Sequence, residues 1–289
     1  AGRADSNIFF SVANSTWSGM ALLSGTSQGG FIDFGDTDAV HRGRILYSHA
    51  NDNMQFNTSA VTRFILDDNS RISLSNNDAG NNNNTIFGKN AGLSIDDGSQ
   101  YNTFIGDGVS DASMDNAISN VGVGFNALTS LTSGDQNVAI GTQALNDVST
   151  GSDNIAIGTQ ASFNLTTGNL NVVIGTQALH TATDSSNIVA IGIYAGLDIN
   201  DTAADGSVLI GRSAGENITS GSGNTAVGYQ TLDATTTQSN STAIGYNAGG
   251  ASAGNSNLFV GYNAGATGTN DVVSGTQNTI VGTSARASS

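Results

Sequence analysis

The sequence predicts an all-β chain in which a parallel β-solenoid, or β-roll, of about twelve coils follows a small β-rich domain. Three observations support this fold class. A unit ending in glycine recurs about every 17 residues over most of the chain. Strand-forming Ile, Val and Thr precede that glycine in most units, and no stretch shows a convincing helical period. Internal repeats of this kind are typical of solenoid architectures.

The composition favours an ordered, acidic repeat protein. The 289 residues include 38 glycines, no proline and no cysteine, and the formal net charge is −15. Disordered chains combine low hydrophobicity with many charges, whereas only 11% of these residues are charged and apolar residues recur at fixed intervals. The eight Lys and Arg residues are mostly scattered, so no phosphate-tracking surface is predicted. Disulfide and thiolate chemistry are excluded, and no apolar run is long enough to insert into a membrane.

Residues 1–77 lack the repeat and form the first predicted domain, a shaft or connector with an intertwined β structure. Residues 78–289 form the second, the β-roll. Gly, Asn and Asp punctuate short strand-like runs in the first domain. These runs are Ile8–Val12, Met20–Leu23, Phe31–Phe34, Arg44–Tyr47, Asn53–Phe56, Thr62–Leu66 and Arg71–Leu74.

The repeat unit reads Asn or Ser, two variable residues, Ile, Val or Phe, and Gly, as in Asn137–Gly141 and Asn154–Gly158. The final glycine of each unit is called the anchoring glycine below. Alanine usually follows it by three residues, and a second glycine often precedes it by seven. The twelve anchoring glycines are Gly88, Gly106, Gly124, Gly141, Gly158, Gly175, Gly192, Gly211, Gly228, Gly245, Gly261 and Gly282.

The chemistry of one unit predicts a coil. The residues one and three before the anchoring glycine are mostly β-branched and share one face of a strand, because strand side chains alternate. The residue between them is often Ala, Val, Leu or Phe and lies on the other face. Each glycine allows a corner where a side chain would clash or φ must be positive. Two short strands and two turns are therefore predicted in each coil.

A strand that is apolar on both faces is buried on both faces. One face can fill the interior of its own coil, while the other needs a neighbour. Since a thin solenoid buries little surface alone, cyclic assembly about the rod axis is expected. We also expect that Asp in place of Ile157 or Ile174 would bury an unpaired charge and disrupt its coil.

The Asn-x-Ala-Ile-Gly unit resembles the head repeat of trimeric autotransporter adhesins, which is a left-handed parallel β-roll. The longer unit, with Thr-Thr-Gly before it and Ala-Leu after it, is similar to repeats of bacteriophage tail fibres. Residues 42–58 and 63–74 also look like a segment that precedes repeat regions in such fibres. The resemblance implies a left-handed homotrimer on a virion, with host-surface and tail-protein partners.

Candidate catalytic and cofactor sites are weak. Ser48, His49 and Asp52 lie close in sequence, but catalytic triads are assembled in space and not by adjacency. The segment from Gly122 to Ala127 mimics a dinucleotide-binding fingerprint, yet that motif needs a helix after the strand. We interpret it as one more repeat, and we expect no catalytic residue and no bound cofactor.

Two other features have competing interpretations. The acidic turns at 67–69, 96–98 and 198–201 could hold Ca²⁺, which takes several oxygen ligands, but none has a full calcium-loop spacing and solvated turns are favoured. Tyr229, Tyr246 and Tyr262 each follow an anchoring glycine and are predicted to form a ladder. The ladder could contact sugars or could be structural, and no receptor-binding residue is assigned.

Three functions are therefore considered. The favoured one is a phage tail-fibre module that attaches to a host cell. The second is the head of a bacterial surface adhesin, which would have a C-terminal membrane anchor. The third is a polysaccharide depolymerase on a solenoid scaffold, which needs a pair of carboxylates. We expect no such pair at matching coil positions, and so no enzymatic activity.

Overall fold

The computed structural model describes residues 8–11, 19–22, 24–25, 27–35, 43–58, 61–66, 72–74, 83–200, 204–250, 254–266 and 275–286. The chain divides into two compact units, Ala1–Asp78 and Ala79–Ser289, next to the predicted boundary. All regular elements of the described residues are strands, apart from single turns, so the predicted all-β class is confirmed. Within this part of the chain, no helix is long and apolar enough to cross a membrane.

The described residues of the first unit form seven strands, and each overlaps one of the seven strand-like runs in the sequence. β1 and β2 form an antiparallel pair, while the others form an antiparallel sheet in the order β3-β4-β5-β6-β7. Its register places Ile45 between Ile32 and Phe56. The strands are β1 (Ile8–Ser11), β2 (Gly19–Leu22), β3 (Gly29–Phe34), β4 (Gly43–Ser48), β5 (Asn53–Thr58), β6 (Val61–Leu66) and β7 (Ile72–Leu74).

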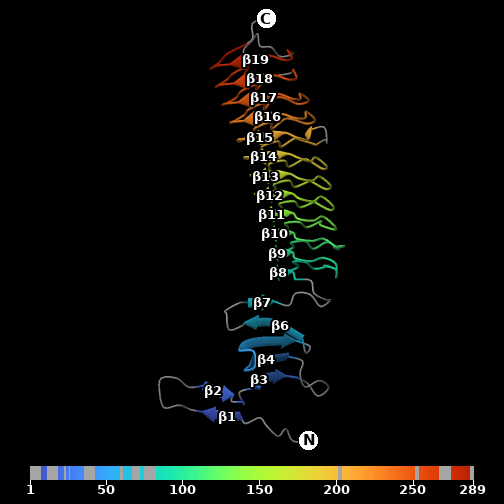
Figure 1. Ribbon diagram of the computed structural model, residues 1–289, viewed down its shortest axis with the longest axis vertical. Coiled ribbons are helices and arrows are strands. Elements are labelled where there is room, and N and C mark those ends of the chain that lie inside the picture. Colours follow the sequence, from blue (N-terminus) through green and yellow to red (C-terminus); the bar gives the residue numbers. More distant parts are fainter. Residues whose placement is uncertain are drawn as a thin grey trace. The chain divides into compact units, whose positions relative to one another are not determined.

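The second unit is a β-solenoid built on one 12-stranded parallel sheet, in which each strand pairs with the strands of the adjacent coils. In Figure 1 these strands lie one above another in chain order, from teal to red. The strands are β8 (Thr85–Phe87), β9 (Thr103–Ile105), β10 (Val121–Val123), β11 (Val138–Ile140), β12 (Ile155–Ile157), β13 (Val172–Ile174), β14 (Val189–Ile191), β15 (Val208–Ile210), β16 (Thr225–Val227), β17 (Thr242–Ile244), β18 (Leu258–Val260) and β19 (Thr279–Val281).

The pairing has no register shift from coil to coil. Val138 pairs with Ile155, and Ile155 pairs with Val172. Because each coil repeats the same backbone path, equivalent residues stack in rows along the solenoid. A residue can therefore be described by its distance from the anchoring glycine, and each such position forms one row along the solenoid.

The prediction of two strands per coil is wrong. Each described coil contributes one three-residue strand, and the opposite side is made of turns. The reason is a run of left-handed backbone: Gln143 and Leu145, two residues apart, have φ of 57° and 48°, which breaks an extended segment. Backbone hydrogen bonds still join the coils on this side, as from Leu145 N to Ala161 O at 3.0 Å.

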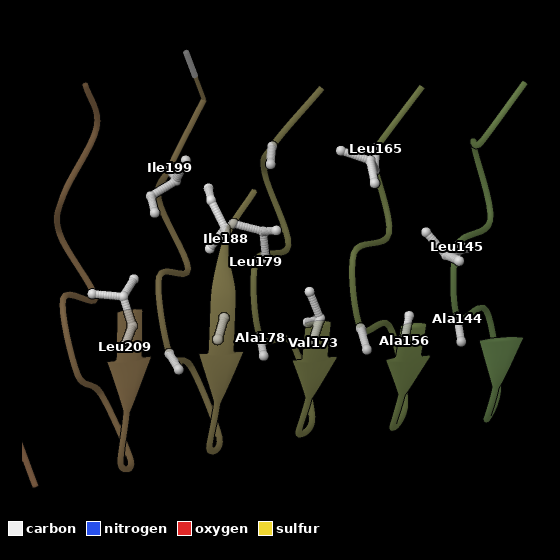
Figure 2. Close-up of a cluster of buried hydrophobic side chains, with 14 of the residues drawn as sticks. Ala144, Leu145, Ala156, Leu165, Val173, Ala178, Leu179, Ile188, Ile199 and Leu209 are labelled. Atoms are coloured by element: carbon white, nitrogen blue, oxygen red, sulfur yellow. The ribbon is translucent and has the colours of Figure 1, made fainter. Parts of the chain in front are cut away.

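The interior of the solenoid is filled from two sides. The middle residue of each strand from β9 to β19, such as Ala156 or Val173, lies on the interior side and is buried. Leucines on the facing turns, such as Leu165 and Leu179, are also fully buried, and Figure 2 shows their side chains pointing toward those of the strands. The alanine that follows the anchoring glycine by three residues completes this core, as at Ala144.

The anchoring glycines lie where neighbouring coils approach most closely. All twelve have φ between 130° and 144°, a region that L-residues rarely adopt. A Cβ at Gly158 would lie 2.7 Å from the carbonyl carbon and oxygen of Gly175. The second glycine has a similar role, since a Cβ at Gly134 would lie 2.2 Å from Gly151 O. Stacking therefore requires the anchoring glycine in the coils that another coil follows, and it requires the second glycine where the next coil approaches as closely as at Gly134.

A buried ladder of asparagines was not predicted. The asparagine that opens most units is buried in the solenoid, and from Asn102 to Asn171 each one bonds to the equivalent asparagine of the adjacent coil. Ile188, Ser207 and Ser241 interrupt this row. Asn154 Nδ2 donates to Asn137 Oδ1 at 3.1 Å and to Gly168 O at 2.8 Å, and Asn137 Oδ1 also accepts from Asn154 N. Such a ladder satisfies polar groups that burial would otherwise leave unpaired.

Candidate interaction surfaces

The outer face of the solenoid sheet is an apolar surface that its own chain leaves uncovered. We define this outer face as the residues one and three before each anchoring glycine. All are Val, Ile, Leu, Phe or Thr, and none is charged. Those at least 36% exposed include Phe87, Ile105, Ile140, Ile155, Ile174, Ile244 and Val281.

The area of the outer face is large for a monomer. It runs the length of a 12-stranded sheet, and Ile140 and Ile244 leave 39% and 43% of their surface uncovered. Its exposed area is on the order of 1,000 Å², against about 300–600 Å² for the largest apolar patch of a typical monomer. A surface of this size, apolar and without charge, has the character of a protein–protein interface.

The predicted burial of Ile157 and Ile174 by their own coil is wrong. Ile174 is 37% exposed and Ile157 is partly exposed, because both lie on the outer face and not in the interior. An aspartate at either position would meet solvent in a single chain. Its effect should therefore fall on whatever covers the outer face, and only indirectly on the coil.

The antiparallel sheet of the first unit has the same property. Cross-strand pairing gathers one apolar face, on which Ile45 lies opposite Phe56, and Phe56 lies opposite Phe64. Six residues of this face are 38% to 56% exposed: Ile32, Phe34, Tyr47, Met54, Phe56 and Leu66. The opposite face carries a polar cluster, in which Arg44 Nε donates to Asp33 Oδ1 at 2.6 Å. Each unit, taken by itself, thus presents an uncovered apolar sheet face.

The predicted tyrosine ladder is present. The rings of Tyr229 and Tyr246 stack at 5.1 Å between centroids, and those of Tyr246 and Tyr262 stack at 5.2 Å. Because the rings cover one another's faces, the ladder presents mainly edges and hydroxyls to its surroundings. A sugar that stacks on an aromatic ring needs a free ring face, so this geometry favours the structural interpretation.

The residues considered for catalysis have other partners. Asp52 accepts a hydrogen bond from the Tyr47 hydroxyl at 3.0 Å, and the His49 ring packs edge-on against Tyr47. The Asp52 carboxylate raises the pKa of Tyr47 through this hydrogen bond. The segment from Gly122 to Ala127 is β10 followed by a turn, and not a helix, so it is a solenoid coil as predicted.

Of the three acidic turns considered for Ca²⁺, the structure describes residues 96–98 fully and residues 198–201 in part. Asp96 caps its own turn: its carboxylate accepts hydrogen bonds from Ser99 N at 3.0 Å and from Asn116 N at 3.3 Å. Residues 67–69 lie outside the described residues, as does Asp201. Among the described residues, no three His, Cys, Asp or Glu side chains are grouped to hold a metal ion. Calcium binding stays an untested possibility.

The expectation of no carboxylate pair at matching coil positions is wrong. Glu216 and Asp233 each lie five residues after an anchoring glycine, Gly211 and Gly228, and so occupy one row in adjacent coils. Burial raises the pKa of Asp233, and the Glu216 carboxylate raises it further. The spacing of the glycines could have revealed this pair, because it shows which residues share a row.

The charge on Asp233 is expected to destabilise the folded chain. Since the pKa of Asp233 is raised on folding, its contribution to stability is present below the unfolded-state pKa and is lost as pH rises through the folded-state pKa. We expect Asp233→Asn to raise the melting temperature at pH 7, with no gain below about pH 3.9, the ordinary pKa of aspartate. Thermal melting followed by circular dichroism measures both.

The control for this substitution is Asp97→Asn, which removes the same charge from an exposed turn. An equal gain in both variants would show that only the net charge of −15 matters. A gain for Asp233→Asn that persists in acid would show that the carboxylate is not the cause.

Comparisons with protein-family models, with curated proteins and with solved structures find no match to this chain.

Proposed function

We propose that the chain is a structural and adhesive fibre module that assembles as a homotrimer, and that the fibre is a phage tail fibre attaching to the host cell surface. The observation that carries the assembly is the uncovered apolar outer face. A second copy of the chain is the occupant that fits it. The face repeats at the coil spacing of about 4.8 Å, and only a partner with the same repeat can match it over the whole sheet.

Charge supports the same occupant. The described acidic residues of the solenoid lie outside the outer face, which has no charged residue. Copies that meet through the outer face can therefore keep their acidic side chains in solvent, where the repulsion between them is screened. The uncovered face of the first unit is explained in the same way, by an intertwined domain with a shared core.

The attachment role rests on the resemblance of the repeat to tail-fibre repeats. A rigid rod with an acidic, soluble surface suits a virion component that extends into the medium. In this proposal the partners are a host glycan or protein and other tail proteins. The chain carries out no catalysis, binds no cofactor or nucleic acid and does not insert into a membrane.

Light scattering tests the assembly. The purified chain is expected to have three times the mass of one 29.1 kDa chain. Ile157→Asp should shift the protein toward single chains, because it places a charge in the shared core, while Thr167→Asp, at an exposed position away from the strand, should leave the mass unchanged. A folded wild-type monomer would contradict the proposal.

Competition on a susceptible host tests the attachment role. An excess of the purified chain should reduce phage adsorption, and an equal amount of the monomeric Ile157→Asp variant should do so less. Adsorption that is unchanged by the assembled chain would count against a receptor-binding role. Inhibition of bacterial adhesion in place of phage adsorption would favour the adhesin alternative.

The carboxylate pair makes the depolymerase alternative testable. A glycosidase needs a general acid of raised pKa beside a second carboxylate, and Asp233 with Glu216 meets the first of these requirements. Incubation of the chain with host capsule is expected to release no sugar. Release that Asp233→Asn abolishes would overturn the proposal in favour of an enzyme.

A further inference from the structure

Two exposed rows border the outer face along the whole solenoid. The leading row is the residue five before each anchoring glycine, and the trailing row is the residue directly after it. Every residue of both rows is exposed in all the described coils. Because the strand lies between them, the leading row borders its beginning and the trailing row borders its end.

The sizes of the two rows are reciprocal in most coils. Where the trailing residue is aromatic or long, the leading residue of the same coil is small. These trailing residues are Phe125, Arg212, Tyr229, Tyr246 and Tyr262, and their leading counterparts are Ser119, Gly206, Gly223, Asn240 and Ser256. Where the trailing residue is Thr142, Thr176, Thr283 or Asp107, the leading residue is the larger Gln136, Leu170, Gln277 or Tyr101.

Local backbone preference does not explain this pattern. The leading row is left-handed in every coil, with φ of 59° at Tyr101 and 60° at Leu170, and such a backbone favours Gly or Asn throughout. Tyr101 and Leu170 nevertheless occupy it, and they are 58% and 57% exposed on their own chain. Bulky residues in a strained conformation, facing solvent, gain nothing within one chain.

The two rows also cannot compensate for each other inside one chain. They are six residues apart across an extended strand, a path of up to about 20 Å. Along the axis, a large trailing residue contacts the trailing residues of the adjacent coils, as the stacked rings of Tyr229, Tyr246 and Tyr262 show. The space beside a small residue of one row must therefore be filled by a large residue of the other row that belongs to another copy of the chain.

We infer that neighbouring copies meet along a seam in which the trailing row of one copy packs against the leading row of the next, coil against equivalent coil. This inference rests on the proposed homotrimer and specifies how its subunits join. Such a contact is heterologous and closes into a ring when each copy is related to the next by the same rotation. Because the leading and trailing residues that match in size belong to the same coil, equivalent coils of the copies lie at the same height along the axis.

One charged position agrees with the seam. Arg212 is a cation of the trailing row, and the leading residue of its coil is Gly206. Asp205, next to Gly206, is part-buried, and its Oδ1 accepts a hydrogen bond from Ser186 N at 2.7 Å. Across the seam, Arg212 of one copy would enter the space beside Gly206 and meet this carboxylate. The tyrosine ladder would likewise lie in the seam, where its edges are covered.

Disulfide cross-linking tests the seam, since the chain has no cysteine of its own. The variant Asp153→Cys with Thr159→Cys places one thiol in each row of the same coil. Under oxidation it should run as three covalently joined chains on a denaturing gel without reductant. Each single variant should run as one chain, because the seam pairs the leading row with the trailing row and does not pair either row with itself.

A size exchange gives a second readout that does not need disulfide geometry. Thr176→Tyr should lower the temperature at which the assembly dissociates, because Leu170 of the next copy leaves no room for the ring. Adding Leu170→Gly should restore that temperature. Adding Thr167→Ala, at an exposed position outside both rows, should not restore it.

The possible outcomes separate the seam from the assembly itself. A trimer by light scattering that shows neither cross-linking nor rescue would overturn the seam and leave the proposed homotrimer intact. Cross-linked pairs from a single variant would show a two-fold contact and contradict the heterologous seam. A folded monomer would contradict both proposals.

Discussion

Gly158→Ala is expected to destabilise the solenoid by at least about 4 kcal/mol, among the largest effects of a single methyl group. The glycine has φ of 135°, and the added Cβ would lie 2.7 Å from backbone atoms of Gly175. A backbone conformation that is nearly restricted to glycine costs about 1–3 kcal/mol. The remainder arises because the next coil is fixed by its own ladder and cannot move away.

Hydrogen exchange measures where this loss occurs. In a solenoid each coil contacts only its neighbours, so exchange should accelerate most in β12 and β13 and least near β19, the strand farthest from them. The control is Gly282→Ala, where φ is 130° but an added Cβ meets only Ala285 Cβ, at an ordinary contact distance of 3.6 Å. A similar loss in both variants would mean that backbone conformation, and not the close approach of coils, makes the anchoring glycine necessary.

Asn137→Leu is expected to cost about 3–5 kcal/mol, because it leaves two buried backbone groups without partners at about 1–3 kcal/mol each. Asn137 Oδ1 accepts from Asn154 N at 3.1 Å, and Asn137 Nδ2 donates to Gly151 O at 2.8 Å. Leucine has a similar volume and is more apolar. If only apolar burial mattered, this substitution would cost little stability. Thermal melting therefore distinguishes an effect of lost hydrogen bonds from an effect of hydrophobicity.

Asn137→Ser is the matched variant for the ladder. Serine already occupies this row at Ser207, whose Oγ accepts from Asn224 N at 3.2 Å. The serine variant should keep the acceptor and lose the two bonds that Asn137 Nδ2 donates, to Gly151 O and to Asn120 Oδ1, so its melting temperature should lie between those of the wild type and Asn137→Leu. Equal losses in both variants would show that the ladder acts through side-chain volume and not through hydrogen bonds.

Much of the fold could be predicted from the repeat. The spacing of the anchoring glycines located all the solenoid strands, because each glycine ends a strand at the same point of the coil. The seven runs in residues 1–77 were also found, since alternation and turn residues are local signals. The prediction of a second strand per coil was wrong because Gln143 and Leu145 have left-handed φ values, which break an extended segment and are unusual for these residue types.

The candidate surfaces could be predicted only in part. The tyrosine ladder follows from equal spacing after the glycines. The pairing of Glu216 with Asp233 was missed, although the same spacing places them in one row. The asparagine ladder could not be found by periodicity alone, because a polar residue at a regular position is ordinarily assigned to the surface, and its burial depends on a partner in the next coil.

The sequence by itself determined the repeat, the strand positions and the need for a second apolar contact, because these depend on spacing and on side-chain branching. Only the tertiary structure decided which strand face is inside. Ala156 points inward and Ile157 outward, although both are apolar, because every coil follows the same path and places the middle residue of its strand inside, whether that residue is Ala156 or Phe104. The residues on either side of it are therefore left on the outer face, where a second copy of the chain can cover them.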